Sequence, residues 1–256
     1  MDYWAQLSVD IANQDNYLDL LFQVYPTIPE ECRDINQTIW GKVKDAFENR
    51  NNQEMIKALL GLNLFPIKDS YVAYLKHDPS AIERNPETIN RISGRIFQMG
   101  LDKLYEKCSQ PKETNRQIGP LFKRWINKGY LGIMPISYDE FIHSKRNAIL
   151  DGSDNEMKRF AKEHLGYSRE KGLDFVGRFN GKYVIGEAKF LTDFGGHQNA
   201  QFEDAISTLH AQCNAVKIAI LDGVCYIKGR NKLFRGVESH ANIMSALVLR
   251  DFLYQV

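Results

Sequence analysis

The amino-acid sequence predicts an α/β fold, with a mixed β-sheet core flanked by helices and a mostly helical N-terminal portion. The first observation is that apolar residues recur at helical spacing through most of residues 1–150. The second is a change after residue 150, where two short apolar runs precede a helical segment and a third apolar run. The order strand, strand, helix, strand is typical of α/β proteins. We expect the third strand, residues 216–221, to lie parallel to the second.

The N-terminal portion is predicted to be a series of helices. Its first helix, residues 3–22, contains a polar stretch at residues 13–16 that breaks or kinks it. Residues 71–75 fit either a strand or a helical turn. At the start of the last helix, Ser137 and Glu140 have the spacing of a capping box. The other predicted helices cover residues 30–49, 54–60, 87–107, 120–126 and 137–149.

The C-terminal portion begins after a flexible, acidic joint at residues 151–154. We therefore expect residues 1–150 to contribute to a binding cleft and residues 151–256 to form the core, as two domains or as one continuous domain. A helix over residues 155–165 should end at Gly166. A hairpin over residues 173–190 should follow, with its turn at Asn180-Gly181. Gly195-Gly196 should then begin a helix over residues 197–212. The remaining predicted elements are strands over residues 216–221 and 224–227 and a final helix over residues 239–254.

Composition limits the class of protein. The chain has 256 residues, 43% hydrophobic and 25% charged, with a formal net charge of +1, which is ordinary for a globular protein. This balance neither demands nor excludes nucleic acid, because lysines and arginines can gather on one surface. Four scattered cysteines disfavour zinc ribbons and disulfide frameworks. Since the N-terminus lacks an apolar signal core and no run approaches the roughly 20 apolar residues of a membrane span, we expect a soluble, cytoplasmic protein.

Three charged residues of the predicted hairpin form the candidate catalytic site, and we call them the trio: Asp174, Glu187 and Lys189. Asp174 lies on the first strand, and the other two lie on the second, where side chains two residues apart point to the same face. Their neighbours are apolar. Two carboxylates and an ammonium on an apolar sheet are costly unless something compensates them, and a divalent metal ion would do so. The alternative is an acid at the edge of a hairpin and the solvated face of an edge strand.

These residue types suit the chemistry of phosphate esters. Two carboxylates on adjacent strands offer hard oxygen ligands to Mg²⁺ and leave positions for water and a phosphate oxygen. The ion would polarise the phosphoryl group and lower the pKa of water, while Lys189 would orient that water and stabilise negative charge. The sequence contains no competing set: it has no Gly-rich phosphate loop ending in Lys-Ser/Thr, no Gly-x-Ser-x-Gly elbow and no His-Glu-x-x-His motif.

The trio, with Ala188 between its last two members, resembles the motif of the PD-(D/E)XK nuclease superfamily. Within that superfamily, the Gly-rich and amide-rich segment 186–201 is similar to the surroundings of type II restriction endonucleases. The resemblance covers about residues 155–230. It departs from the motif at Leu173, which stands where the proline would be. The resemblance implies a restriction-endonuclease-like core, Mg²⁺ as cofactor and double-stranded DNA as substrate.

The resemblance also implies roles for single residues. It makes the two carboxylates of the trio Mg²⁺ ligands, the backbone carbonyl of Ala188 a further ligand, and Lys189 the cation that activates water. Many members carry another acid on the helix before the hairpin. Glu163 fits this position best and Glu156 second, and the alternative for both is an ordinary surface residue of a helix.

Two segments are candidates for DNA contact. Gly195-Gly196 would let backbone amides approach a phosphate, and amide side chains of the following helix suit base edges. A basic loop before residue 118 suits phosphates or guanine. The alternatives are a loop hinge, a polar helix face and a solvated loop. The candidate DNA-binding residues are Arg116, Gln117, Gly196, Gln198, Asn199 and Gln201.

The resulting hypothesis is a type II restriction endonuclease of a prokaryotic restriction–modification system. It would hydrolyse specific phosphodiester bonds of double-stranded DNA with Mg²⁺ and leave 5′-phosphates. A homodimer is expected, because two-fold DNA sites are matched by two-fold proteins. The alternatives are a repair or junction-resolving nuclease of the same superfamily, an inactive DNA-binding module with this fold, and an interaction protein in which the trio is a coincidence.

Overall fold

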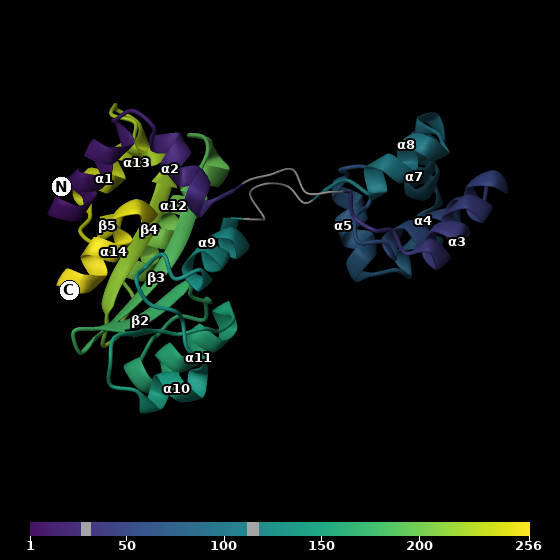
Figure 1. The fold of residues 1–256 in the computed structure, drawn as a ribbon. Helices are drawn as coiled ribbons and strands as arrows, with labels where there is room; N and C mark the ends of the chain where they lie inside the picture. Colours follow the sequence, from purple (N-terminus) through teal and green to yellow (C-terminus); the bar gives the residue numbers. More distant parts are fainter. Residues whose placement is uncertain (27–31, 112–117) are drawn as a thin grey trace. The chain divides into compact units, whose positions relative to one another are not determined.

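The computed structural model describes residues 1–26, 32–111 and 118–256 (Figure 1). The chain divides into two compact units. Unit 1 joins Met1–Ile28 to Thr114–Val256, and unit 2 is Pro29–Glu113. Unit 2 is therefore an insertion within the sequence of unit 1.

This division differs from the expected one at residue 150. The first helices of the chain and the helix that begins at residue 118 have their apolar residues in the same core as the sheet. Val9, Leu21 and Phe122 are examples, each at most 2% exposed. Burial of these side chains, which favours the folded state by about 1.5–3 kcal/mol each, requires that these helices pack with the C-terminal half.

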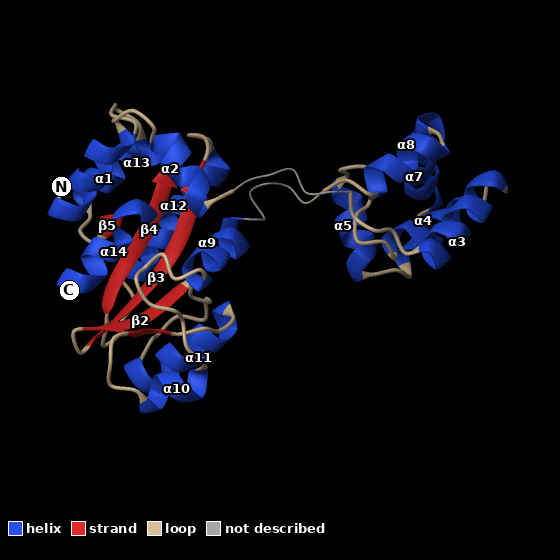
Figure 2. Cartoon of the chain, viewed as in Figure 1, coloured by secondary structure: helices blue, strands red, loops and turns tan. Residues whose placement is uncertain are grey.

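Unit 1 is built on a five-stranded mixed sheet with the order β1-β2-β3-β4-β5 (Figure 2). β1, β2 and β3 pair antiparallel, whereas β3, β4 and β5 pair parallel. The predicted mixed sheet and the parallel pairing of the strand at residue 216 are thereby confirmed. The strands are Ala148–Ile149 (β1), Phe175–Phe179 (β2), Lys182–Leu191 (β3), Val216–Gly223 (β4) and Ile243–Met244 (β5).

The β2–β3 hairpin turns where the sequence predicts. Asn180 and Gly181 have φ angles of 49° and 78°, which a tight two-residue turn requires and which Asn and Gly adopt most easily. A glycine is also needed within β3, because a Cβ on Gly186 would lie 2.8 Å from Cγ1 of Ile218 on β4. The pairing of β2 with β3 ends at Phe175 opposite Gly186, so β3 extends past the end of β2.

Helices cover both faces of the sheet. Phe175 and Val184 belong to a core that α1, α2, α9, α12, α13 and α14 share, whereas Val176 and Ile185 belong to a second core with α10 and α11. This split follows from the alternation of side chains along a strand. The helices of unit 1 are Tyr3–Ala12 (α1), Tyr17–Val24 (α2), Ile118–Asn127 (α9), Tyr138–His143 (α10), Asp154–Leu165 (α11), Gly196–Leu209 (α12), Lys232–Ser239 (α13) and Ala246–Gln255 (α14).

Unit 2 is helical and has a core of its own. Met55, Ile56 and Leu59 on one helix and Ile92 and Ile96 on another are fully buried there. Residues 71–75, left open by the sequence, are helical. The helices are Gln37–Glu48 (α3), Asn52–Leu60 (α4), Ser70–His77 (α5), Ala81–Arg84 (α6), Pro86–Met99 (α7) and Leu101–Cys108 (α8).

Two predicted helices of the N-terminal half are shorter than expected. The single helix over residues 87–107 is wrong, because Gly100 adopts a φ of 78° and separates α7 from α8. The helix over residues 30–49 begins only at Gln37, where the Asn36 side chain accepts the N–H of Ile39 at 3.1 Å. Residues 27–31 lie outside the described part of the chain.

The predicted helix over residues 137–149 is only partly correct. Half of the predicted capping box is present, since Oγ of Ser137 accepts the N–H of Glu140 at 3.3 Å. The Glu140 carboxylate accepts a hydrogen bond from Arg146 at 2.7 Å. The helix ends at His143, however, and Ala148–Ile149 form β1 instead. The buried guanidinium of Arg178 on β2 donates to the carbonyl of Phe141 at 3.2 Å, so a carbonyl near the helix end is satisfied from outside the helix.

The predicted strand over residues 224–227 is wrong, and Val224–Tyr226 form a 3₁₀ turn. The chain leaves the sheet at Gly223, whose φ is 93°. The final predicted helix over residues 239–254 is also wrong in its first part. Ile243–Met244 pair with β4, and α14 starts only after Ser245, whose Oγ accepts the N–H of Leu247 at 3.1 Å.

In the described part of the chain, no helix combines the length and the apolar character that a membrane span needs.

Candidate active site

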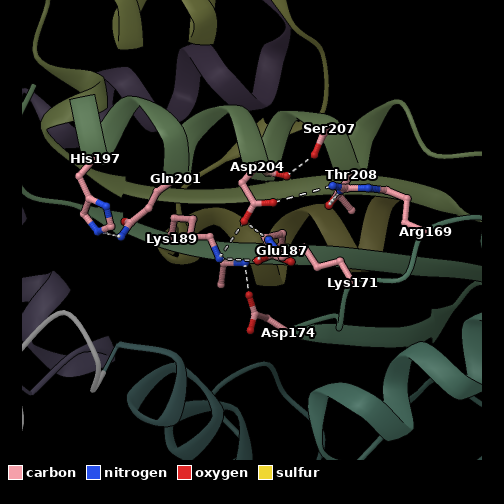
Figure 3. A network of polar contacts seen from close by, with 11 residues as sticks. Arg169, Lys171, Asp174, Glu187, Lys189, His197, Gln201, Asp204, Ser207 and Thr208 are labelled. Carbon is pink, nitrogen blue, oxygen red and sulfur yellow. Dashed lines mark hydrogen bonds and ion pairs between the residues drawn. The ribbon is translucent and has the colours of Figure 1, made fainter. Parts of the chain in front are cut away.

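Asp174 lies immediately before β2 and beside the part of β3 that extends past it (Figure 3). Its N–H donates to the carbonyl of Gly186 at 3.1 Å, and its Oδ2 accepts the N–H of Ala188 at 2.8 Å. The Asp174 side chain thus accepts a hydrogen bond from β3 beyond the point where the backbone pairing of β2 with β3 ends. Because the N–H and C=O of one strand residue point to the same side, the Ala188 carbonyl also faces the side of Asp174.

Glu187 and Lys189 project from the same face of β3, as the predicted alternation requires, and Nζ of Lys189 contacts Oε1 of Glu187. The Glu187 side chain is 3% exposed and that of Lys189 is 21% exposed. Among the described residues, nothing forms a hydrogen bond with the buried Oε2 of Glu187. The structure therefore brings the trio together around a buried carboxylate, one oxygen of which lacks a hydrogen-bond partner among the described residues.

Two further residues, missed by sequence reasoning, complete this cluster. Nζ of Lys171, in the loop before β2, lies 2.6 Å from the same Oε1 of Glu187. Lys171 also contacts Oδ2 of Asp204 on α12, which lies 4.0 Å from Nζ of Lys189. The carboxylates of Glu187 and Asp204 are therefore each close to both lysines (Figure 3).

The sequence carried a signal for only one of these residues. A helix that connects two parallel strands packs on their sheet, and residues three apart on a helix share a face. Gln201 and Asp204 have this spacing, and both line the pocket described below. Lys171 follows no periodic pattern, so its approach to Glu187 depends on how the loop folds.

Burial controls the electrostatics of the site. It raises the pKa of Asp174 to about 7, and the negative charge of Glu187 contributes to the same direction. For Lys189, burial alone would lower the pKa, but the charges of Glu187 and Asp174 outweigh it and raise the pKa above its ordinary value. Asp154, the first residue of α11, adds a smaller negative influence on Asp174. Asp174 is thus the carboxyl of the trio whose charge changes near neutral pH.

A pocket of about 190 Å³ opens onto this cluster. Its walls come from the hairpin, from α12 and from α9, so all three elements shape the approach to the trio. The lining residues are Ile118, Gly119, Asp174, Ala188, Lys189, Phe190, Gln201 and Asp204.

The donor set fits a magnesium ion. Mg²⁺ keeps several water molecules and takes one or two carboxylates from a protein, together with phosphate oxygens of the substrate. Asp174 and the unpartnered oxygen of Glu187 would supply these carboxylates, and the Ala188 carbonyl faces the side of Asp174. Among the described residues, no three His, Cys, Asp or Glu side chains converge as a metal site, so water and substrate would have to provide the other ligands.

The acids predicted on the helix before the hairpin do not join the trio. Glu163 is exposed, and its Oε2 accepts the hydroxyl of Tyr138 at 3.0 Å. Glu156 completes a capping box with Ser153 at the start of α11. The acid of this helix whose charge acts on Asp174 is instead Asp154.

The candidate DNA-binding residues have different surroundings. Gln198 is 5% exposed, and its amide bonds the backbone N–H and the hydroxyl of Thr192 at 3.3 and 3.2 Å, so it faces the protein. Asn199 donates to the carbonyl of Phe194 at 3.3 Å. Gly196 is exposed, and a Cβ added there would meet no atom within 4 Å. Arg116 and Gln117 lie outside the described residues.

The whole sequence carries a relationship to known proteins. The family model described as Tsp45I type II restriction enzyme matches residues 2–256. The chain belongs to this family. It is therefore a type II restriction endonuclease, a site-specific deoxyribonuclease that binds double-stranded DNA. No curated protein and no solved structure gave a significant match.

The family assignment confirms the predicted resemblance to type II restriction endonucleases. It extends that resemblance from residues 155–230 to almost the entire chain and includes unit 2. The family assignment therefore favours a restriction endonuclease over the three alternatives: a repair or junction-resolving nuclease, an inactive DNA-binding module, and an interaction protein without a catalytic site.

Proposed function

We propose that the trio is the catalytic centre of a Mg²⁺-dependent endonuclease of the PD-(D/E)XK type that leaves 5′-phosphates. The observation that supports this proposal is the state of Glu187. One of its buried oxygens contacts two lysines, while the other lacks a hydrogen-bond partner among the described residues. Asp174, immediately before the neighbouring strand β2, accepts the N–H of Ala188 beside it. A buried carboxylate with an unpartnered oxygen, such as that of Glu187, costs stability, and binding of a cation offsets that cost.

In this proposal, each residue of the site has a separate role. Asp174 and Glu187 hold the Mg²⁺ ion, with the Ala188 carbonyl beside them. When bound, the ion supplies polarisation of the phosphate and a lower pKa for water. Lys189 donates hydrogen bonds that orient the attacking water and stabilise negative charge on the phosphate oxygens. Asp204 and Lys171 keep the Glu187 and Lys189 side chains in place.

The deciding experiment compares two variants with a control. Glu187→Gln and Lys189→Met should each reduce Mg²⁺-dependent cleavage of plasmid DNA by about 100-fold or more, with DNA affinity retained. Lys232→Met is the matched control, because Lys232 forms an exposed ion pair with Glu203 at 2.8 Å. Normal cleavage by either Glu187→Gln or Lys189→Met would refute the assignment.

The proposal includes contacts to DNA beside the trio. Gln201 lines the pocket, and its Nε2 lies 3.0 Å from Nε2 of His197, one turn earlier on α12. Gln201, the backbone of Gly196 and the side chain of Asn199 all provide amide groups near the start of α12. Such groups can bind phosphates and the edges of bases. Arg116 and Gln117 stay in the proposal on their sequence alone. A homodimer on a two-fold DNA site is also proposed, and the mass of the complex in solution tests it.

A further inference from the structure

Unit 2 carries two arginines that share one carboxylate. The side chain of Asp69 is only 7% exposed and caps α5 by accepting the N–H of Tyr71 at 3.0 Å. Its Oδ2 also lies 2.7 Å from Nη1 of Arg91 and 3.7 Å from Nη1 of Arg95, both on α7. The hydrogen bond from Arg91 holds the pKa of Asp69 below its ordinary value. One carboxylate therefore hydrogen-bonds one guanidinium group and lies within ion-pair distance of a second, so it neutralises only one of two positive charges.

The two arginines remain accessible. Residues four apart lie on one side of a helix, and 46% of the Arg91 side chain and 53% of the Arg95 side chain are exposed. The Arg91 guanidinium lies 5.3 Å from the ring centre of Tyr71, which is itself 61% exposed. Arginine and tyrosine are among the residues enriched where proteins meet partners.

A groove continues this surface. A pocket of about 360 Å³ lies beside Arg95 and is lined by Ile67, Gln98, Met99 and Lys103 as well. Of the described residues that line it, two are cationic, one is an amide and none is acidic. We call Tyr71, Arg91, Arg95, Gln98 and Lys103 the arginine face.

We propose that the arginine face of unit 2 contacts the backbone of double-stranded DNA. The partner follows from charge and chemistry: guanidinium groups match phosphate oxygens, and the exposed cations exceed the single carboxylate that orders them. Because Asp69 holds Arg91 in place before DNA arrives, less side-chain entropy is lost on binding. The inference rests on the action of this family on duplex DNA, and it assigns to unit 2 a share in substrate binding.

The test removes two charges and leaves the bond between Asp69 and Arg91 intact. The variant is the full-length chain with Arg95→Gln and Lys103→Gln. Its matched control is Lys57→Gln with Arg84→Gln, which removes the same charge from unit 2 at residues paired with other acids. Both proteins should keep the wild-type melting temperature. Binding to a fluorescently labelled duplex of mixed sequence is measured by fluorescence anisotropy over a range of salt concentrations in EDTA, where no cleavage interferes.

The arginine-face variant should bind about tenfold more weakly, and its slope of log affinity against log salt should fall by about 0.9 for each phosphate that the protein no longer neutralises. The control should keep the wild-type affinity and slope. Lys103→Gln alone leaves the contacts of Asp69 unchanged. This single variant should show part of the decrease in the slope of log affinity against log salt concentration. Unchanged affinity and slope, or an equal loss in the control, would overturn the proposal. The arginine face and the proposed catalytic site are tested by different measurements. The first is tested by the affinity for DNA and its salt dependence, and the second by the rate of cleavage in the Glu187→Gln variant.

Discussion

Nζ of Lys171 lies 2.6 Å from Oε1 of Glu187, the oxygen that Lys189 also contacts. Two lysines thus compensate one carboxylate that is 2% exposed. A divalent cation bound to Glu187 would supply the same compensation, so Lys171 and the cation are alternatives in electrostatic terms. This relationship makes protein stability a measure of cation binding that is independent of cleavage.

Lys171→Met should lower the melting temperature in EDTA, because the buried carboxylate loses one of its two cations at a cost of about 1–3 kcal/mol. Ca²⁺ should then raise the melting temperature more in this variant than in the wild type, since the bound ion replaces the lost charge. Lys232→Met, in an exposed pair, should change stability by at most about 1 kcal/mol. Equal responses of Lys171→Met and wild type to Ca²⁺ would contradict the expectation.

Asp174 should make cation binding dependent on pH. Because burial raises its pKa to about 7, this carboxyl is mostly protonated below that pH and must lose its proton to act as a ligand. The concentration of Ca²⁺ needed for half-maximal binding should therefore decrease as pH rises from about 6 to about 8. Asp174→Asn should weaken binding and remove this dependence on Asp174. A wild-type affinity that is constant over this pH range would show that Asp174 does not bind the ion.

The local part of the site could be predicted from sequence because it depends on short-range rules. Asn180-Gly181 fixes the turn, strand alternation places Glu187 and Lys189 on one face, and the pairing of β2 with β3 brings Asp174 close to them. Each rule acts over a few residues, so the trio needed no knowledge of the rest of the fold.

The remaining parts depend on packing between distant segments. Lys171 and Asp204 reach Glu187 only after a loop and a crossover helix have packed on the sheet. Unit 2 was missed for the same reason. The helices before it and after it look like their neighbours in sequence, and only the burial of residues such as Leu21 and Phe122 shows that they belong to unit 1.

A buried acid outside the trio should contribute to the pH dependence of stability. Asp222, at the end of β4, is fully buried and accepts hydrogen bonds from the hydroxyls of Tyr25 and Ser245, at 2.9 and 2.5 Å, and from the N–H of Ala246 at 3.2 Å. Burial nevertheless raises its pKa from 3.8 to about 7. The folded chain therefore holds more protons than the unfolded chain between these values, and stability falls as pH rises from about 4 to about 7.

Asp222→Asn should remove the contribution of residue 222 to the pH dependence of stability, because an amide does not titrate in this range. The amide also keeps an oxygen that can accept the Tyr25 hydroxyl. The free energy of unfolding of the wild type, relative to the variant, should decrease between about pH 4 and pH 7 by roughly 4 kcal/mol at most, at about 1.4 kcal/mol per pH unit. Urea unfolding of both proteins across this range measures the difference. Parallel curves for the two proteins would mean that Asp222 keeps an ordinary pKa.

Unit 2 should fold without the rest of the chain. It has its own apolar core, and domains of about 55–65 residues already fold alone, so a fragment of residues 29–113 is large enough. The fragment should unfold cooperatively in urea, with helical circular dichroism. Ile92→Ala should destabilise it by about 2–5 kcal/mol, because Ile92 is fully buried on α7, whereas Tyr74→Ala, at an exposed position, should cost about 0.5 kcal/mol or less. Gradual unfolding of the fragment, or equal effects of the two substitutions, would show that the core of unit 2 depends on unit 1.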